Sequence, residues 1–428
     1  MGYRGSSDQR PSQKQGLARA FGLGLVTGAA DDDCSAIGTY ASAGAQFGTS
    51  LLWTAPVTFP MMFAVVYLSS KLGQVTGKGL FHVIKENYPR WILWPALVGA
   101  VTGNVIEAAA DIGAMAAALN IFLPLSSFVI VIGVATLVLA LQVFGSYELI
   151  RNVFRWLALV LFAYLGSAIL AQPDPWEVLQ GTFVPTFHFS REFLSILVAI
   201  IGTTLSAYLY TWQSNVEVEE KIAKGQERLS ERRGASEREL RESRKDIVIG
   251  MLFSNIIMFF IMLSTGATLH RAGDTQIETA AQAAEALRPI AGEAAGLLFA
   301  TGIIAVGFLA VPIMTTGAAY DICNVMGWNG TLHGRPKEAK AFYGLIVGFT
   351  LLAVALNALG FNPMKALVYS GIVQGFSTPP LLLLIMLMTS KRAIMGDKVN
   401  SPAMNVLAWV TLGAIFAATL ALVVTWFL

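Results

Sequence analysis

The sequence predicts an all-α polytopic membrane protein, and three observations lead to this fold class. Apolar residues make up 55% of the 428 residues and charged residues only 13%, with a mean hydropathy of +0.61. A soluble domain carries about 25% charged residues. The apolar residues gather in repeated stretches of roughly 20, the length that a membrane-spanning helix needs. The third observation is the placement of the basic residues between these stretches.

Eleven apolar stretches are long enough to be spans, and proline and glycine mark many of the joins between them. We place the spans at 18–44, 48–70, 92–118, 122–146, 152–171, 194–214, 247–268, 292–322, 342–359, 363–390 and 403–427. Residues 1–17 form a polar tail. Because aspartates interrupt the first span, it lacks the continuous apolar region of a cleaved signal peptide, and we expect it to be retained.

Lysine and arginine orient the spans, because cytoplasmic loops carry an excess of both. With the amino terminus in the cytoplasm, only four of the 29 basic residues fall on the outer side: Arg191, Arg271, Arg288 and Lys365. We therefore expect a multi-pass protein of a bacterial plasma membrane, with its amino terminus inside. Its expected partner is the lipid bilayer, and not a nucleic acid.

Two polar connections contain helix start signals. The charged cytoplasmic loop 215–246 contains "SERE" at Ser236–Glu239, a capping box that predicts a solvated helix from this point. We favour a surface helix with ion pairs over a regulatory or docking role for this loop. A second capping box, at Thr275–Glu278, predicts a short helix between spans seven and eight.

The first span carries three consecutive aspartates, Asp31, Asp32 and Asp33. One aspartate at the centre of a bilayer costs about 2.5–3.5 kcal/mol on insertion scales. Successive helical residues point 100° apart, so the three side chains cannot all face one partner. Non-helical backbone at membrane depth is tolerated only where it lines a cavity or is buried in protein. We expect the first span to be interrupted here.

The sixth span has a similar fault, with Gly202, Thr203, Thr204 and Ser206 in its middle. The hydroxyl groups have an alternative role, which is to bond back to helix carbonyls. Two interrupted spans five apart indicate inverted repeats and are typical of a transporter binding site. We divide the chain into a first repeat, 18–171, a second repeat, 194–390, and an eleventh span, 403–428.

Two further spans contain buried polar residues. Asn104, Glu107 and Asp111 share one face of the third span. Two like charges four residues apart repel, so one carboxyl holds a proton or a cation lies between them. Gln374 in the tenth span is interpreted as a helix–helix contact or as part of an ion pathway.

These groups suit a hard divalent cation such as magnesium, calcium or manganese, because they offer carboxylate, hydroxyl and carbonyl oxygens. The four histidines, His82, His188, His270 and His333, fall outside the spans, and no methionine is adjacent in sequence to the two breaks. Cys34 next to Asp33 is interpreted as a small buried thiol rather than a ligand. No catalytic Ser–His, Cys–His or histidine cluster appears within the spans, so we expect neither an enzyme nor a resident cofactor.

The residues at the two breaks resemble the Nramp family of divalent-metal transporters, and most closely its branch of Nramp-related magnesium transporters. In "DCSAIGTYASAGA", Asp33 matches the metal-binding aspartate of the family's DPGN motif, and Ala36 replaces the liganding asparagine. In "GTTLSAYL", Thr203 matches the residue whose carbonyl meets the metal, and Ser206 replaces the liganding methionine. The resemblance implies a LeuT-like fold and transport by alternating access.

The departures from the family motifs imply a change in selectivity. Losing methionine removes a soft ligand. Losing asparagine leaves one side-chain ligand fewer, and the smaller side chains enlarge the site. Such a site fits a partly hydrated magnesium ion, and manganese should also pass. Cys34 and Ala207 also replace prolines, which weakens the local signals for the helix breaks. We expect Asp33 to bind the ion, while Asp31 and Asp32 line its route.

The same comparison predicts transport that is not tightly coupled to protons. Family members are coupled through acidic residues on span three and a histidine on span six. On span six, Gln213 replaces that histidine, and Tyr208 replaces the earlier histidine of the motif. On span three, Ala108 replaces the first acidic residue, whereas Asp111 matches the second. Glutamine and tyrosine do not titrate near neutral pH. Glu107, one residue before the vacant position, is the remaining candidate proton carrier.

Two alternatives share the membrane architecture. A LeuT-fold symporter for an amino acid or another organic solute is disfavoured, because neighbouring aspartates would repel a substrate carboxylate. A passive channel is disfavoured by the paired breaks.

Overall fold

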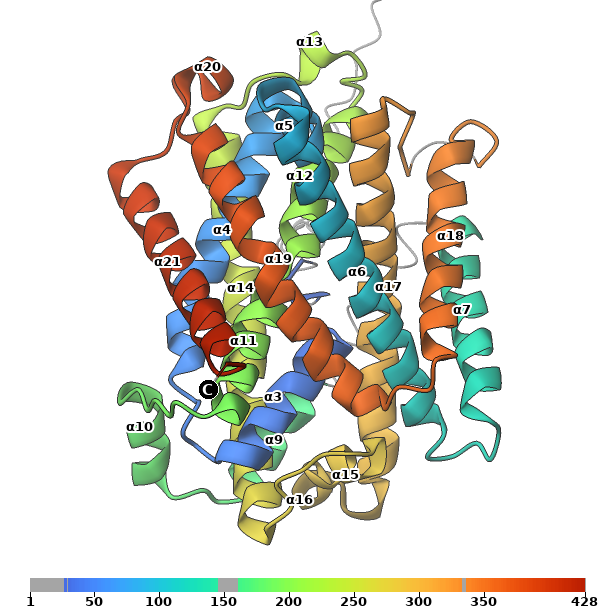
Figure 1. Ribbon diagram of the computed structural model, residues 1–428, viewed down its shortest axis with the longest axis vertical. Coiled ribbons are helices and arrows are strands. Elements are labelled where there is room, and N and C mark those ends of the chain that lie inside the picture. Colours follow the sequence, from blue (N-terminus) through green and yellow to red (C-terminus); the bar gives the residue numbers. More distant parts are fainter. Residues whose placement is uncertain (1–26, 29, 145–160, 333–335, 428) are drawn as a thin grey trace, which may run out of the picture.

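The computed structural model describes residues 27–28, 30–144, 161–332 and 336–427, and in these residues it contains helices and no strands. The helices form an elongated bundle in which most long helices run roughly along the vertical axis of Figure 1. The tail 1–17, the start of span one and residues 152–160 of span five lie outside the described residues.

Each of the eleven predicted spans contains a helix among the described residues. Eight segments are long and apolar enough to cross a membrane by length and composition. The helices assigned to the spans are α3 (Cys34–Phe47), α4 (Thr54–Thr76), α6 (Arg90–Leu119), α7 (Ser127–Phe144), α9 (Phe162–Leu170), α11 (Arg191–Thr204) with α12 (Ala207–Ala223), α14 (Glu237–Thr265), α17 (Ala295–Met326), α18 (Lys340–Asn357), α19 (Pro363–Thr389) and α21 (Pro402–Val424).

Short helices cap the two ends of the bundle. At one end lie α5 (Leu80–Asn87), α13 (Leu229–Arg232) and α20 (Arg392–Met395), at the top of Figure 1. At the opposite end lie α10 (Pro175–Phe183), α15 (Ala280–Glu285) and α16 (Arg288–Ala291). This separation is what an alternating order of eleven spans requires.

One capping box is confirmed and the other is wrong. Ser236 caps α14 by accepting a hydrogen bond from the Glu239 amide (3.2 Å), and a Glu239 carboxylate oxygen accepts from the Ser236 amide (2.7 Å). The predicted solvated helix and span seven are therefore one continuous helix. The box predicted at Thr275–Glu278 lies instead at Thr279, because Gln282 makes the return bond to its amide (3.0 Å).

Helices also extend into the predicted loop 215–246 from both sides. α12 continues to Ala223, and α14 begins at Glu237, which leaves the short α13 between them. The helical residues Glu217 and Lys221 are buried, so this part of the charged segment packs against the bundle.

The first and sixth spans are both interrupted, as predicted. Asp31 ends a short helical stretch, Asp32 and Asp33 are not helical, and α3 begins at Cys34. In the sixth span α11 ends at Thr204 and α12 begins at Ala207. At these interruptions the first residue of α3, the last residue of α11 and the first residue of α12 are all buried, so these helix ends lie within the protein.

Glycine allows α19 to approach the sixth-span break. A Cβ on Gly202 would lie 1.9 Å from the carbonyl oxygen of Gly371 and 2.4 Å from the amide nitrogen of Gly375. A side chain at Gly202 would therefore push α19 away from α11. This contact brings polar residues of α19 to the break.

Candidate functional site

The break in the first span is held by Asp33, which is fully buried. Its Oδ1 accepts a hydrogen bond from the Ala36 amide (2.7 Å), so Asp33 caps the first turn of α3. Its Oδ2 accepts from the Tyr208 hydroxyl (3.0 Å), which also lies 2.6 Å from the Ala30 carbonyl oxygen. Tyr208 is the second residue of α12, so the sixth span contacts both sides of the break in the first.

The break in the sixth span is held by two residues of α19 that are four positions apart. The Thr378 hydroxyl donates to the carbonyl oxygen of Leu205 (2.9 Å), which lies inside the break. The Ala207 amide donates to Gln374 Oε1 (3.3 Å). These bonds satisfy two backbone groups that a helix interruption leaves without intrahelical partners.

Two carboxylates of α6 contact the two breaks from adjacent helical turns. Glu107 accepts from the Ser206 hydroxyl (3.2 Å) and from Gln374 Nε2 (2.6 Å). Asp111 Oδ1 accepts from the Ser35 amide (3.1 Å) and hydroxyl (3.0 Å), in the first turn of α3. The predicted polar face of span three therefore meets both interruptions. Gln374 is an interhelical contact, as one of its two interpretations predicts.

Oxygen acceptors outnumber hydrogens around Ser206. Its hydroxyl lies 3.2 Å from Glu107 Oε1, 3.1 Å from the Gly202 carbonyl oxygen and 2.9 Å from the Thr203 carbonyl oxygen. A serine hydroxyl has a single hydrogen to donate. Thr203 Oγ1 is also buried and has no hydrogen-bond partner among the described residues. Ser206 thus bonds back to helix carbonyls, which is the alternative role of these hydroxyl groups, and the oxygens gathered here are also of the type that hard cations prefer.

Asp31 and Asp32 lie apart from these contacts. Both are fully buried, and they share one donor, the Ser254 hydroxyl of α14, at 2.5 Å and 3.2 Å. Within the described residues their remaining oxygens, Asp31 Oδ1 and Asp32 Oδ2, have no hydrogen-bond partner. In this conformation the two aspartates therefore face the packed interior of the protein.

Gln213 belongs to another buried group. Its Oε1 accepts from Thr27 (2.7 Å), and its Nε2 donates to Glu217 (2.9 Å) one turn further along α12. Glu217 also accepts from Ser70 of α4 (2.6 Å). Gln213 of α12 therefore contacts Thr27, before the first break, and through Glu217 it is connected to α4.

Cys34 and clusters of metal-binding side chains are further candidates for a metal site. The Cys34 thiol lies 3.4 Å from the Ile303 carbonyl oxygen, consistent with a small buried thiol. In the described part of the chain no three residues among His, Cys, Asp and Glu are grouped so that they could hold a metal ion. A cation at the breaks would therefore need backbone and hydroxyl oxygens in addition to carboxylates.

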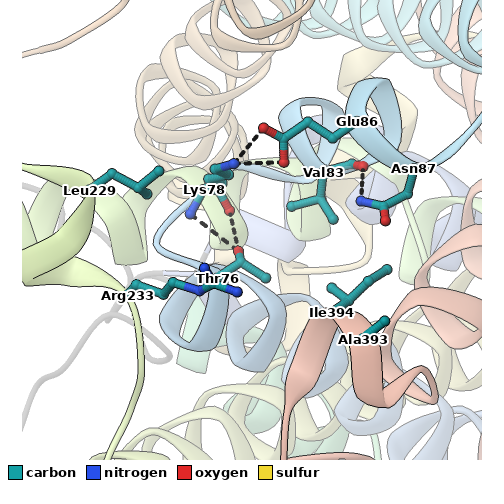
Figure 2. A pocket seen from close by; sticks show the side chains of 9 residues that line it. All are labelled: Thr76, Lys78, Val83, Glu86, Asn87, Leu229, Arg233, Ala393 and Ile394. Carbon is teal, nitrogen blue, oxygen red and sulfur yellow. Dashed lines mark hydrogen bonds and ion pairs between the residues drawn. The ribbon is translucent and has the colours of Figure 1, made fainter.

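A separate cavity lies beside α5, α13 and α20, at the top of the bundle in Figure 1. Its volume is about 220 Å³, and Figure 2 shows Lys78 beside Glu86, with Arg233 across the cavity. Partial burial alone would raise the pKa of Glu86, but its hydrogen bonds to Lys78 and His82 lower the pKa overall. None of the predicted site residues lines this cavity.

Sequence analysis missed Thr378 and Ser254 and gave Tyr208 only a negative role. The signal for Thr378 was its spacing from Gln374, since residues four apart share a helix face. No signal in the sequence connects Ser254 to the aspartates 222 and 223 positions away.

The comparisons with known proteins agree with this architecture. Residues 24–425 match the family described as natural resistance-associated macrophage protein-like, or Nramp. A solved structure of the Eremococcus coleocola manganese transporter superposes with a TM-score of 0.70 at 19% sequence identity, and the match covers 98% of this chain and 88% of that one.

Two further solved structures, each with a different bound ligand, share the fold. MhsT in complex with L-phenylalanine has a TM-score of 0.59 at 13% identity, with 99% of both chains covered. Mhp1, a nucleobase-cation-symport-1 family transporter in a closed conformation with bromovinylhydantoin bound, has a TM-score of 0.58 at 13% identity, covering 95% of this chain and 91% of that one. The expected LeuT-like fold is confirmed.

Proposed function

The chain belongs to the Nramp family of divalent-metal transporters, and from this premise we propose that it carries magnesium or manganese across a membrane by alternating access. The observation that carries the proposal is the contact between the two helix breaks, where Tyr208 of α12 donates to Asp33 before α3. A site between two interrupted helices can open to either side when the halves move relative to each other.

The proposed ligands are the Asp33 carboxylate, the Thr203 carbonyl oxygen and the Ser206 hydroxyl, with Ala36 leaving room beside them. In the present conformation both Asp33 oxygens accept hydrogen bonds. Ion binding would therefore exchange the bond from Tyr208 for the ion. Hard oxygen ligands and a small side chain at position 36 favour an ion that keeps part of its water shell, as magnesium commonly does.

The other polar residues are proposed to form the pathway to and from the site. Glu107, Asp111 and Gln374 contact the breaks directly, and the buried pair Asp31 and Asp32 becomes hydrated when the helices around it separate. Gln213 joins this route through Thr27. We place the amino terminus in the cytoplasm of a bacterial cell, on the basis of the basic residues.

An organic-solute symporter is the disfavoured alternative. Asp33, Glu107 and Asp111 are three buried carboxyl groups at the breaks, and each of them is negative whenever it is ionised. They would repel the carboxylate of an amino acid, which such sites bind at the amino termini of half-helices. The arrangement supports a transporter of cations and gives no support to an enzyme.

The test is manganese influx into proteoliposomes with Asp33→Ala, compared with Asp174→Ala as a matched control. Asp174 also caps a helix, accepting from the Trp176 amide (2.8 Å), but it lies on the exposed α10. We expect influx at the background level for Asp33→Ala and at the wild-type rate for the control. Gel filtration establishes that both variants are folded. Wild-type influx through Asp33→Ala would refute the proposed site.

A further inference from the structure

One face of α17 runs past both helix breaks. A Cβ on Gly307 would lie 3.2 Å from the sulfur of Cys34, the first residue of α3. A Cβ on Gly317 would lie 3.8 Å from Thr211 Oγ1 on α12. Further along α17, Asp321 accepts a hydrogen bond from Asn215 of α12 (3.3 Å). Positions 307, 317 and 321 lie on one side of a helix. Near Gly307 this side faces Met115 of α6 as well as the start of α3, and further along it faces α12.

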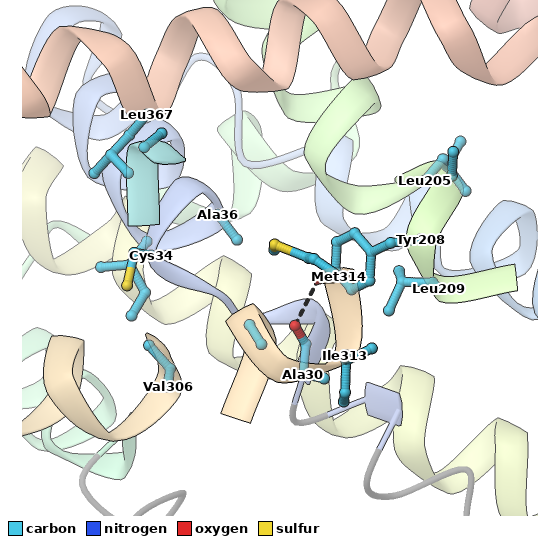
Figure 3. Close-up of a cluster of buried hydrophobic side chains, with 14 of the residues drawn as sticks. Ala30, Cys34, Ala36, Leu205, Tyr208, Leu209, Val306, Ile313, Met314 and Leu367 are labelled. Atoms are coloured by element: carbon cyan, nitrogen blue, oxygen red, sulfur yellow. Dashed lines mark hydrogen bonds between the residues drawn. The ribbon is translucent and has the colours of Figure 1, made fainter. Parts of the chain in front are cut away.

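Met314 belongs to the same face, seven residues after Gly307 and three before Gly317. This register places it between the level of Cys34 and the level of Thr211, beside the first turn of α12. Figure 3 shows the Met314 side chain leaving α17 toward Ala36 and Tyr208. Met314 is fully buried.

The two residues that Met314 approaches are both bonded to the proposed metal-binding carboxylate. The Ala36 amide donates to Asp33 Oδ1, and the Tyr208 hydroxyl donates to Asp33 Oδ2. Met314 is therefore linked to Asp33 through two residues toward which its side chain points and which both bond that carboxylate. Met314 is far from both breaks in the sequence, so a search for methionines adjacent to the breaks does not find it.

We propose that the Met314 thioether is a soft ligand of the transported ion and sets the selectivity of the site. This inference rests on the proposed function and deepens it. A thioether favours soft ions such as cadmium and contributes little to magnesium. Methionine has three rotatable bonds, so its sulfur can approach a soft ion and withdraw from a hydrated hard one. The site thus combines hard oxygens from the two breaks, contributed by Asp33, Thr203 and Ser206, with one sulfur from α17.

The test compares wild type, Met314→Leu and Met258→Leu in proteoliposomes, with manganese influx inhibited by cadmium or by magnesium. Leucine nearly conserves the volume of methionine and removes the sulfur. Met258 is a matched control, because it is buried on α14 with its sulfur 3.8 Å from the Thr58 hydroxyl. We expect Met314→Leu to raise the inhibition constant of cadmium about tenfold or more, the size of effect that changes around a metal produce.

The inhibition constant of magnesium should stay unchanged in Met314→Leu, and both constants should stay unchanged in Met258→Leu. If Met314→Leu leaves cadmium inhibition unchanged, or weakens inhibition by both ions equally, Met314 only fills space and the inference is overturned. If the leucine variant does not fold, Met314→Cys is compared with Met314→Ser, which differs by one atom, and only the cysteine variant should keep its cadmium sensitivity. Wild-type protein that transports neither manganese nor magnesium would instead contradict the proposed function.

Discussion

The Tyr208 hydroxyl lies 3.0 Å from Asp33 Oδ2 and 2.6 Å from the Ala30 carbonyl oxygen, so one phenol of the sixth span contacts both sides of the break in the first. A phenol has one hydrogen, and it can donate fully to only one of these acceptors at a time. The proposed metal-binding carboxylate and a backbone carbonyl therefore compete for Tyr208. An ion bound to Asp33 would release the hydroxyl to Ala30.

Tyr208→Phe should bind manganese more tightly than wild type and unfold at a lower temperature. The ion no longer has to displace a hydrogen bond to a carboxylate, which is worth about 1.5–3 kcal/mol. The dissociation constant should therefore fall by about tenfold to a hundredfold. The Ala30 carbonyl loses its donor, which lowers the unfolding temperature. Calorimetric titration and a thermal scan on the same preparation measure the two effects.

The control for this prediction is Tyr164→Phe. Tyr164 is a buried tyrosine of α9, outside the contacts of Asp33. Its replacement should leave the manganese affinity unchanged. Weaker manganese binding by Tyr208→Phe would show that the phenol helps the ion to bind rather than competing with it.

Thr378→Val should destabilise the protein and slow transport. The Thr378 hydroxyl is the donor to the Leu205 carbonyl oxygen (2.9 Å), and an unsatisfied buried carbonyl costs about 1–3 kcal/mol. The maximal rate of manganese influx should fall more than the apparent affinity, because Thr378 holds the break without being a proposed ligand.

Thr350→Val is the matched control for Thr378→Val. The buried Thr350 hydroxyl donates to Ile346 O (2.9 Å), a carbonyl four residues earlier in the same helix, so it holds no break. Its replacement should leave both the unfolding temperature and the maximal rate close to wild type. Equal losses in the two variants would mean that the Thr378 bond has no special role.

The fold could be predicted largely from local signals. Apolar length locates the helices, because it follows from the solvent that each residue meets, and each of the eleven predicted spans contains a helix among the described residues. Eight of these segments are long and apolar enough to cross a membrane. Helix continuity was predicted less well. The helix start at Ser236 is confirmed, but this charged helix runs into the span predicted to begin at 247 without a break, so the two form the single helix α14. Charge alone does not separate a loop from a solvated helix.

The site could be predicted only in part, because its key contacts are tertiary. Asp33 and the hydroxyl-rich stretch near Ser206 were identified, since intramembrane polar groups are costly and therefore conspicuous. The bonds from Tyr208 and Thr378 that hold the breaks join residues more than 170 positions apart. The sequence has Cys34 and Ala207 where the family has prolines, so the local sequence indicates the breaks only weakly. Long-range hydrogen bonds hold the breaks instead.

Magnesium should compete with manganese at comparable concentrations. Ala36 and Ser206 leave oxygen ligands and open space at the breaks, which favours a partly hydrated hard ion. Manganese influx is measured in proteoliposomes while external magnesium is raised into the millimolar range. Manganese influx that is unaffected by magnesium would show that the proposed hard site does not exist.

The double variant Ala36→Asn with Ser206→Met adds an amide and a thioether to the breaks. It should shift the preference toward transition metals, measured as weaker inhibition by magnesium and stronger inhibition by cadmium. The single variant Ala36→Ser, which adds only an oxygen ligand, is the control and should not increase the cadmium inhibition. An unchanged preference in the double variant would locate the selectivity elsewhere, with Met314 as the next residue to change.

The last prediction is that metal influx is not tightly coupled to proton influx. Gln213, at the position of the family's histidine, is bonded through both ends of its amide, to Thr27 and to Glu217. An amide does not titrate near neutral pH, so this residue connects helices and does not relay a proton. Proteoliposomes with an internal pH dye should show manganese influx without matching acidification.

Glu107 is the residue on which this prediction can fail. Both of its oxygens accept hydrogen bonds at the sixth-span break, from Ser206 and Gln374, and it is the one carboxylate that contacts that break directly among the described residues. Glu107→Gln removes the titratable group, while Glu177→Gln on the exposed α10 serves as the control. Uncoupled transport predicts no metal-dependent acidification in wild type or in either variant. Acidification that follows metal influx in wild type and in Glu177→Gln, but disappears in Glu107→Gln, would overturn the prediction and identify Glu107 as the proton carrier.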